Sequence, residues 1–305
     1  MKIGVIVPQG WTGEYDGWDP AAAWARTRDV ARQVESLGFE SAWLFDHFQT
    51  VPKPTEEITF ESFTTLAALA AHTERVRLGH VVICTAFRNP ALTAKMMSTL
   101  DVISGGRMEL GIGAGWKKDE WLAYGYGYPE TPVRLKMLAD DLEIISRMMA
   151  PGHATWEGQH ASVRDAINVP KPLQQPRVPL TVGGNGRKVT WNLAARYADE
   201  LNLDAVAPSA VPEAMSVIRQ RCEEVDRDPS TLRVSVHMWG GGRDWLRETG
   251  EQDTPMADLL AAYREAGVAR VMTLVSGSAT SDDALDRFAE DARSAGCELA
   301  EAVPA

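Results

Sequence analysis

Cysteine is scarce in this sequence of 305 residues. Only Cys84, Cys222 and Cys297 occur, far apart and without a CxxC pair. An odd number of widely spaced thiols argues against a disulfide framework and against a cysteine-based zinc site. The six histidines include no HxH or HExxH spacing, so we expect no metal site. We expect the thiols to stay reduced, which is typical of the cytoplasm.

The sequence also lacks an excess of basic residues and any long apolar run. A net charge of −11 and a pI near 5.1 argue against general nucleic-acid binding, which requires a basic surface. No run approaches the roughly 18 apolar residues that span a membrane. The opening MKIGVIV has one lysine and no small-residue cleavage site, so we interpret it as a first strand. A small-molecule ligand is therefore expected, without nucleic acid or membrane.

Short apolar runs alternate with helical patterns along the whole chain. Hydrophobic residues make up 45% and charged residues 24%, as in an ordinary globular protein, and the length suits one barrel domain over residues 1–305. The alternation favours an α/β fold, a (β/α)8 TIM barrel, with an open doubly wound sheet as the alternative. We predict strands at residues 3–7, 40–45, 76–84, 108–112, 180–182, 201–203, 232–239 and 268–275.

Residues 150–178 interrupt the alternation of strands and helices. Residues 156–159 have the composition of a hairpin turn, and the proline-rich PKPLQQPRVP that follows is typical of an extended connector. We therefore predict an insertion between the fourth helix and the fifth strand of the barrel.

Glycines follow the predicted strand at 108–112. Gly111, Gly113 and Gly115 form a GxGxG that fails the dinucleotide fingerprint at its third glycine, and the strand is the fourth rather than the first. Two interpretations remain. The glycines let a flat or phosphorylated cofactor approach the main chain, or they only let the strand leave the barrel tightly.

A second glycine-rich turn, GGNG at 183–186, lies between a short predicted strand and a helix. Its N–H groups and the helix dipole would suit a phosphate, with Arg187 and Lys188 nearby. A tight turn without a ligand is the alternative.

The best candidates for proton or hydride chemistry are Asp46 and His47, at the end of the second predicted strand. Histidine titrates near neutral pH, and a carboxylate can orient it. Since adjacent residues point to opposite sides, we expect only one of them to face the barrel mouth squarely. Asp119 and Glu120 would bind a ligand hydroxyl or cap a helix, because acidic residues favour its first turn. Cys84 has no Cys/His arrangement that would make it a nucleophile.

Several segments together resemble the bacterial luciferase-like superfamily. They are DHF at 46–48, the stretch from 88 to 121 that contains ISGGRMELGIGAGW, AYGYGYPE at 123–130 with Arg134, VPKPLQQPRVPLTVGGNG at 169–186 and AARYADELN at 194–202. The resemblance is closest to the coenzyme F420-dependent (deazaflavin) oxidoreductase branch. It extends from the first strand to about residue 204.

This resemblance implies a TIM barrel that holds a deazaflavin or flavin at its C-terminal mouth and transfers hydride at the ring's central carbon. Asp46 and His47 would be the catalytic residues. Val81 and Val82 would form a bulge in the third strand that often carries a non-prolyl cis peptide. The residues implied to bind the cofactor are Val81, Val82, Cys84, Gly113, Ala114, Gly115, Glu120, Gly183, Gly184, Asn185 and Gly186.

Two departures from the family argue against a sugar-phosphate substrate. Trp116 stands where the sugar-phosphate dehydrogenases of this branch carry a glutamate, and residues 50–52 are Thr-Val-Pro where those enzymes carry a tryptophan. We expect Trp11, Trp18 and Trp116 to form an aromatic lip for an apolar or aromatic substrate, unless they pack in the core.

The leading hypothesis is an F420-dependent oxidoreductase, expected by resemblance to be a homodimer. One alternative is an FMN-dependent luciferase-like monooxygenase that a separate reductase supplies with reduced flavin. The other is a catalytically silent flavin-binding protein. The sequence identifies neither the substrate nor the direction of hydride transfer.

Overall fold

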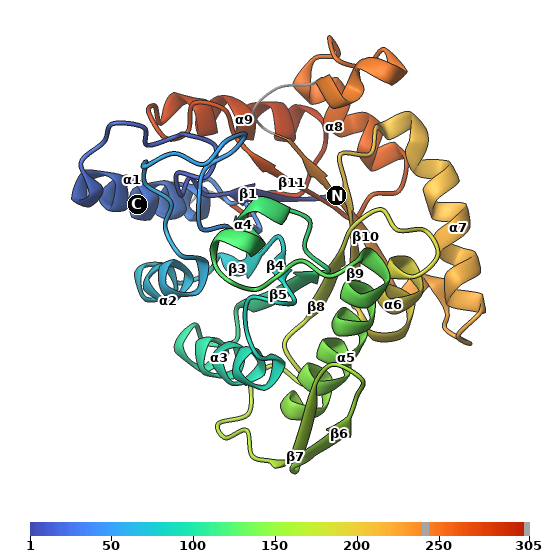
Figure 1. Cartoon of the computed structure of the whole chain (residues 1–305). Helices are drawn as coiled ribbons and strands as arrows, with labels where there is room; N and C mark the ends of the chain where they lie inside the picture. Colours follow the sequence, from blue (N-terminus) through green and yellow to red (C-terminus); the bar gives the residue numbers. More distant parts are fainter. Residues whose placement is uncertain (240–243, 302–305) are drawn as a thin grey trace.

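The computed structural model describes residues 1–239 and 244–301, in which parallel strands close into a barrel wrapped by helices (Figure 1). The sheet order is β3-β2-β1-β11-β10-β9-β8-β5-β4, and a direct β3–β5 pairing closes the ring. The strands are β1 Lys2–Ile6, β2 Ser41–Leu44, β3 Arg77–His80, β4 Ile83–Cys84, β5 Met108–Gly113, β8 Leu180–Gly183, β9 Glu200–Asp204, β10 Arg233–Met238 and β11 Arg270–Leu274.

The predicted barrel is confirmed, and the open-sheet alternative is wrong because the β3–β5 pairing leaves no free edge. The eight predicted strands lie where we expected them, although the third is divided into β3 and β4. The Val81–Val82 peptide between these two pieces is cis, as the family resemblance implies.

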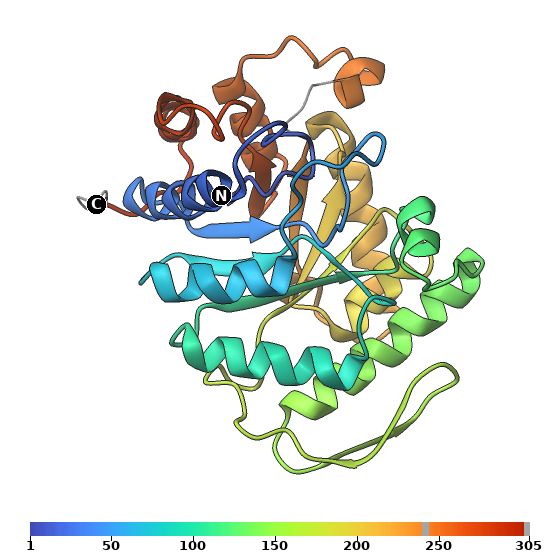
Figure 2. The ribbon, with the colours of Figure 1, turned by 60° about the vertical axis from the view of Figure 1, so that its left-hand side comes forward.

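The helices follow the strands and cover the outside of the barrel (Figure 2). Asp19 and Asn89 each accept two amide hydrogen bonds as N-caps, and each precedes a proline at the first helical position, which fixes where these two helices begin. The helices are α1 Pro20–Ser36, α2 Ser62–His72, α3 Pro90–Ile103, α4 Lys118–Ala123, α5 Thr131–Met149, α6 Thr190–Tyr197, α7 Val211–Glu223, α8 Met256–Glu265 and α9 Asp283–Ser294, with short 3-10 helices η1 Pro208–Ala210, η2 Pro229–Thr231 and η3 Asp244–Thr249.

The predicted insertion is an antiparallel hairpin that projects away from the barrel (Figures 1 and 2). Its strands are β6 Ala154–Glu157 and β7 Ser162–Ala166, so its turn falls close to the residues that the sequence indicates. Asp140 of α5 anchors the turn by accepting hydrogen bonds from the amide of His160 (2.7 Å) and the indole of Trp156 (3.3 Å). The hairpin thus lies between α5 and β8, at the predicted place.

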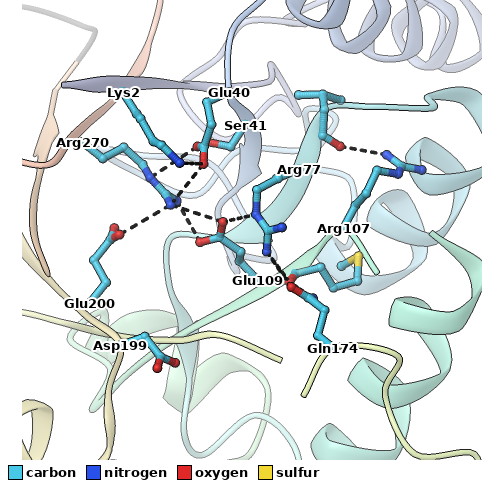
Figure 3. A network of polar contacts seen from close by, with 12 residues as sticks. Lys2, Glu40, Ser41, Arg77, Arg107, Glu109, Gln174, Asp199, Glu200 and Arg270 are labelled. Carbon is cyan, nitrogen blue, oxygen red and sulfur yellow. Dashed lines mark hydrogen bonds and ion pairs between the residues drawn. The ribbon is translucent and has the colours of Figure 1, made fainter. Parts of the chain in front are cut away.

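Charged side chains fill the floor of the barrel, where the strands begin (Figure 3). Arg270 is 1% exposed and donates to Glu109 at 2.8 and 3.2 Å, and it lies 3.4 Å from Glu40 and 3.5 Å from Glu200. Arg77 also donates to Glu109. Each buried charge here therefore has a partner of opposite sign, as burial requires.

Among the described residues, none of the helices has both the length and the apolar character needed to cross a membrane.

Candidate active site

A cavity of about 500 Å³ opens at the C-terminal ends of the barrel strands. This is the end at which barrels place their ligands, and the volume lies in the usual range of small-molecule sites. Almost all the candidate residues from the sequence line it, namely Trp11, Asp46, His47, Val81, Val82, Cys84, Gly113, Ala114, Gly115, Trp116, Glu120, Gly183, Gly184, Asn185 and Gly186.

Trp18 is the exception, and the prediction that it belongs to the aromatic lip is wrong. It does not line the cavity. It packs instead against Tyr15, with ring centroids 5.3 Å apart, in a small apolar cluster under the loop that follows β1. The alternative reading of this tryptophan as a packing residue therefore holds.

Asp46 is 2% exposed, and protein groups engage both oxygens of its carboxylate. Arg88 donates to them at 2.8 and 2.9 Å, Ser62 at 2.8 Å and the amide of Cys84 at 3.0 Å. Burial opposes ionisation, but the charge and hydrogen bonds of Arg88 outweigh it, so the pKa of Asp46 lies below its ordinary value. Asp46 thus has the environment of a positioning residue and not of a proton donor.

His47 is the member of this pair that retains a free ring edge. Its Nδ1 lies 2.7 Å from Oε2 of Glu120, whose other oxygen accepts the amides of Phe48 (2.6 Å) and Gln49 (3.2 Å). A carboxylate only accepts hydrogen bonds, so Nδ1 carries the proton and Nε2 remains available. Glu120 is 0% exposed and its contacts within the protein are extensive. It therefore orients His47 rather than binding a ligand hydroxyl.

Asp119, the neighbouring carboxylate in the first turn of α4, is paired with Lys117 at 2.8 Å. Its hydrogen bond to Lys117 lowers the pKa of Asp119. Asp119 lies in the first turn of α4, but the N-cap position is Lys117 and no side chain caps this helix, so the prediction of a capping role is wrong. Asp119 does not line the cavity.

The glycines at the strand ends are required by the packing of the protein itself. A Cβ atom on Gly113 or Gly183 would lie 3.0 or 2.8 Å from the side chain of Val82, and one on Gly115 would lie 2.5 Å from Sγ of Cys84. Neither interpretation from the sequence anticipated this. These glycines make room for Val82 and Cys84, which then form the wall of the cavity.

The turn at 183–186 has the features of an anion site. Within residues 1–239 and 244–301, the backbone N–H groups of Asn185 and Gly186 donate no hydrogen bond, whereas that of Gly184 is bound to Asn202 at 3.0 Å. We expected Arg187 to lie near a bound phosphate at this turn. It forms an ion pair with Glu213 at 2.5 Å instead and does not line the cavity. A different arginine lines the cavity.

That arginine is Arg134 of α5, which is 6% exposed. One nitrogen donates to Thr131 at 3.0 Å, and the guanidinium lies over the ring of Tyr128 at 4.1 Å. Its Nε and Nη1 atoms are buried and have no hydrogen-bond partner within residues 1–239 and 244–301. A buried, always charged guanidinium without an anion is costly, so Arg134 indicates that the cavity binds a negatively charged group.

Aromatic rings form a wall of the cavity beside His47. Trp11 stacks on His47 with centroids 4.2 Å apart and an interplanar angle of 1°, and it lies 5.6 Å from Trp239. Trp116 is 58% exposed at the rim, 5.9 Å from His47. The wall suits a flat, largely apolar molecule.

Sequence reasoning missed the residues that the later strands contribute, Asp204, His237 and Trp239, all of which line the cavity. The only signal was their place at the ends of the sixth and seventh predicted strands. Cys84 also lines the cavity, but burial raises the pKa of its thiol far above the ordinary value, which agrees with the reading that it is not a nucleophile.

Residues 1–238 match the model of the luciferase-like monooxygenase family. An F420-dependent glucose-6-phosphate dehydrogenase of Microbacterium testaceum is 36% identical over 220 residues, which cover 68% of this chain and 63% of that protein. A protein of the same name from Intrasporangium calvum is 30% identical over 253 residues, 73% of each chain.

Solved structures share the fold at low sequence identity. An F420-dependent secondary alcohol dehydrogenase in complex with an F420-acetone adduct superposes with a TM-score of 0.78 over 96% of this chain and 98% of its own, at 20% identity. The FMN-bound oxygenating constituent of 3,6-diketocamphane monooxygenase from Pseudomonas putida gives 0.75 over 98% and 99%, at 16% identity. Relatives and neighbours thus include both deazaflavin-dependent and FMN-dependent enzymes.

Proposed function

The chain belongs to the luciferase-like monooxygenase family, and within it we propose that it is an F420-dependent oxidoreductase. The reaction would transfer a hydride between the deazaflavin and an apolar or aromatic organic substrate. The names of the relatives that are 36% and 30% identical support the choice of cofactor.

The observation that carries this proposal is that one cavity contains both a buried cation without an anion and a surface suited to a flat ring. Arg134 and the free amides of Asn185 and Gly186 would hold the phosphate of the cofactor. Val81, Val82 and the glycine-lined strand ends would lie against its ring system. The residues present therefore fit a flat, phosphorylated cofactor.

The chemistry that a bound deazaflavin supplies is a ring carbon that accepts or donates a hydride. The protein contributes proton handling, because Nε2 of His47 faces the cavity with its tautomer set by Glu120. Asp46 and Arg88 hold the loop that carries His47. Trp11 excludes water from one face of the imidazole by stacking on it.

A sugar phosphate is not the substrate we propose, despite the names of the relatives. The wall beside His47 is aromatic, and Lys117, the other buried cation among the described cavity residues, is already paired with Asp119. Arg134 is assigned to the phosphate of the cofactor. No other unpaired buried cation therefore remains among the described cavity residues to bind the phosphate of a sugar phosphate.

Binding of oxidised F420 and of FMN to the purified chain tests the proposal. We expect F420 to bind with a Kd in the low micromolar range or below, and FMN to bind more weakly. His47→Ala should keep F420 binding but lose roughly 10²- to 10⁴-fold in turnover, the usual share of a general acid or base. F420 affinity no better than high micromolar would reject the proposal.

The FMN-dependent monooxygenase is the second candidate, favoured by the FMN-bound neighbour and by a 29% identical pyrimidine monooxygenase of Pseudomonas syringae. Tight FMN binding with oxygen uptake on addition of reduced FMN would select it, and a separate reductase would then be needed. The catalytically silent alternative would be revived if His47→Ala left turnover of the true substrate unchanged.

We also propose a homodimer in the cytoplasm. Free Cys84, Cys222 and Cys297 suit a reducing compartment. Exposed apolar side chains gather on α3 and the insertion, where Lys95 donates to the carbonyl of Val169 and so holds the two segments together. These side chains are Leu92, Val102, Ile103, Ile167, Val169 and Leu173. Light scattering on the purified chain would show a mass of about twice 33.4 kDa.

A further inference from the structure

A second imidazole oriented by a carboxylate lines the same cavity. His237, near the end of β10, is directly opposite Asp204 of β9 in the parallel ladder. Its Nδ1 lies 3.0 Å from Oδ1 of Asp204, and the residue is 5% exposed. Neighbouring parallel strands place these two side chains on the same side, so the contact follows from the register.

Asp204 is itself held in place. The indole of Trp239 donates to the same Oδ1 atom at 3.1 Å. The side-chain amide of Asn185 donates to the backbone carbonyl of Asp204 at 2.7 Å and accepts its N–H at 3.0 Å. The carboxylate therefore presents a fixed acceptor, which places the proton of His237 on Nδ1.

The other ring nitrogen, Nε2, is buried and has no hydrogen-bond partner in the described part of the chain. An unsatisfied buried polar atom costs free energy and needs an explanation. The side chain of Asp204 is 49% exposed and both residues line the cavity, so Nδ1 of His237 faces a residue of the rim and Nε2 lies on the other side of the ring.

The two imidazoles are joined by aromatic rings. His47 stacks on Trp11, Trp11 lies 5.6 Å from Trp239, and Trp239 lies 5.1 Å from His237. Both histidines use Nδ1 for a carboxylate. The wall thus has an acceptor nitrogen at each end and an apolar surface between them.

A histidine–carboxylate contact alone would not carry a conclusion. His153 and Asp165 of the hairpin region make one at 2.8 Å, but their side chains are 52% and 78% exposed, and water can satisfy the free nitrogen. Among the described residues, His80 also has buried ring nitrogens without partners, but it does not line the cavity, whereas His237 does.

We propose that Nε2 of His237 binds a polar group of the substrate, at a distance from the group that reacts beside His47. Because a neutral imidazole with its proton on Nδ1 accepts at Nε2, the matching group is a hydroxyl or N–H donor. The substrate is therefore a flat, mostly apolar compound that carries such a donor. This assignment rests on the proposed function, since it describes the substrate of that site.

A pair of probes that differ by one hydroxyl tests the assignment. The full chain, with ¹⁵N-labelled histidine, is titrated with 4-ethylphenol and with ethylbenzene. We expect 4-ethylphenol to move the Nε2 resonance of His237 and to bind roughly three- to tenfold more tightly, the usual range for one hydrogen bond. The resonances of His153 serve as the internal control and should not move.

His237→Phe should remove this preference while leaving the affinity for ethylbenzene within about twofold, and Asp204→Leu should weaken the preference by freeing the imidazole. A preference that persists in His237→Phe overturns the proposal. So does an unmoved Nε2 resonance in the unaltered chain, a result that needs no variant to fold.

The probe titration is made without cofactor, so its failure is separable from failure of the proposed function. F420 that binds while the phenol preference is absent would reject only the role of His237. Absence of F420 binding would reject the proposed function.

Discussion

Two buried arginines at opposite ends of the barrel differ in their ion pairs. At the floor, Arg270 lies among Glu40, Glu109 and Glu200 and forms ion pairs with all three (Figure 3). At the mouth, Asp46 is paired with Arg88, but Arg134 forms no ion pair within the described residues, and two of its buried nitrogens lack a hydrogen-bond partner there. Paired charges at the floor hold the strands in place, whereas an unpaired charge at the mouth is a cost that a ligand can remove.

The largest expected effect is at the floor. Arg270→Met would leave Glu109 and Glu200 buried without their shared cation, and breaking such a pair typically costs about 3–5 kcal/mol. Urea denaturation would measure the loss of unfolding free energy. Arg164→Met is the control, since the side chain of Arg164 is 88% exposed and its contact with Glu157 is 4.0 Å long. We expect a change below about 0.5 kcal/mol there.

Within the floor, the two glutamates should differ. Burial opposes ionisation of both, but Arg270 and Arg77 lower the pKa of Glu109 to about 2, whereas burial prevails at Glu200 and raises its pKa. Glu109→Gln should therefore destabilise the fold more than Glu200→Gln at pH 7. The reverse order would show that the floor does not depend on the bidentate Arg270–Glu109 contact.

The contrast between the two ends also explains what the sequence could predict. Alternating apolar runs define the strands, and the glycines and Asp46-His47 fall at strand ends. The fold and about half of the cavity can therefore be predicted from short segments of the sequence. The Arg270–Glu109 pair joins residues 161 positions apart, and the Asp204–His237 pair depends on strand register. Such contacts form only once the barrel closes, which single segments do not reveal.

The two glycine motifs illustrate the same limit. Their position after a strand was predictable, but the side chain of Val82, which a Cβ atom on Gly113 of β5 or Gly183 of β8 would meet at 3.0 or 2.8 Å, was not. The orphaned guanidinium of Arg134 was equally hidden. The family resemblance includes Arg134, but only the packing of α5 shows that two of its guanidinium nitrogens are buried without a hydrogen-bond partner in the described part of the chain.

Asp141 is a buried carboxyl on the side of the barrel mouth, and its ionisation provides a further test of how this end of the protein tolerates buried charge. It is 4% exposed, it accepts a hydrogen bond from Thr85 just after β4, and burial raises its pKa to about 7. A pKa raised in the folded state means that stability is full at low pH and is lost as pH rises toward 7. The unaltered chain should lose unfolding free energy between pH 5 and pH 8, and this loss should be about 2 kcal/mol smaller in Asp141→Asn.

Thermal unfolding of both proteins at pH 5 and pH 8 would measure this difference. Thr85→Val is the matched variant, because it removes the hydrogen bond that favours the ionised form and should enlarge the loss at pH 8. Equal pH dependence in Asp141→Asn and the unaltered chain would mean that this carboxyl is ionised at neutral pH, with a cation or water that compensates it.

The smallest expected effect decides whether the mouth is a ligand site at all. Arg134→Met should weaken F420 binding roughly tenfold, since a hydrogen bond to a charged group contributes about 1.5–3 kcal/mol, and should leave stability unchanged or slightly increased because it removes an unpaired buried charge. Arg134→Lys keeps the charge but not the forked donors, so its affinity should lie between the two. If Arg134→Met instead destabilised the chain as strongly as Arg270→Met, its guanidinium would be a structural charge like those of the floor, and the phosphate would have to be held by the amides of residues 185 and 186 alone.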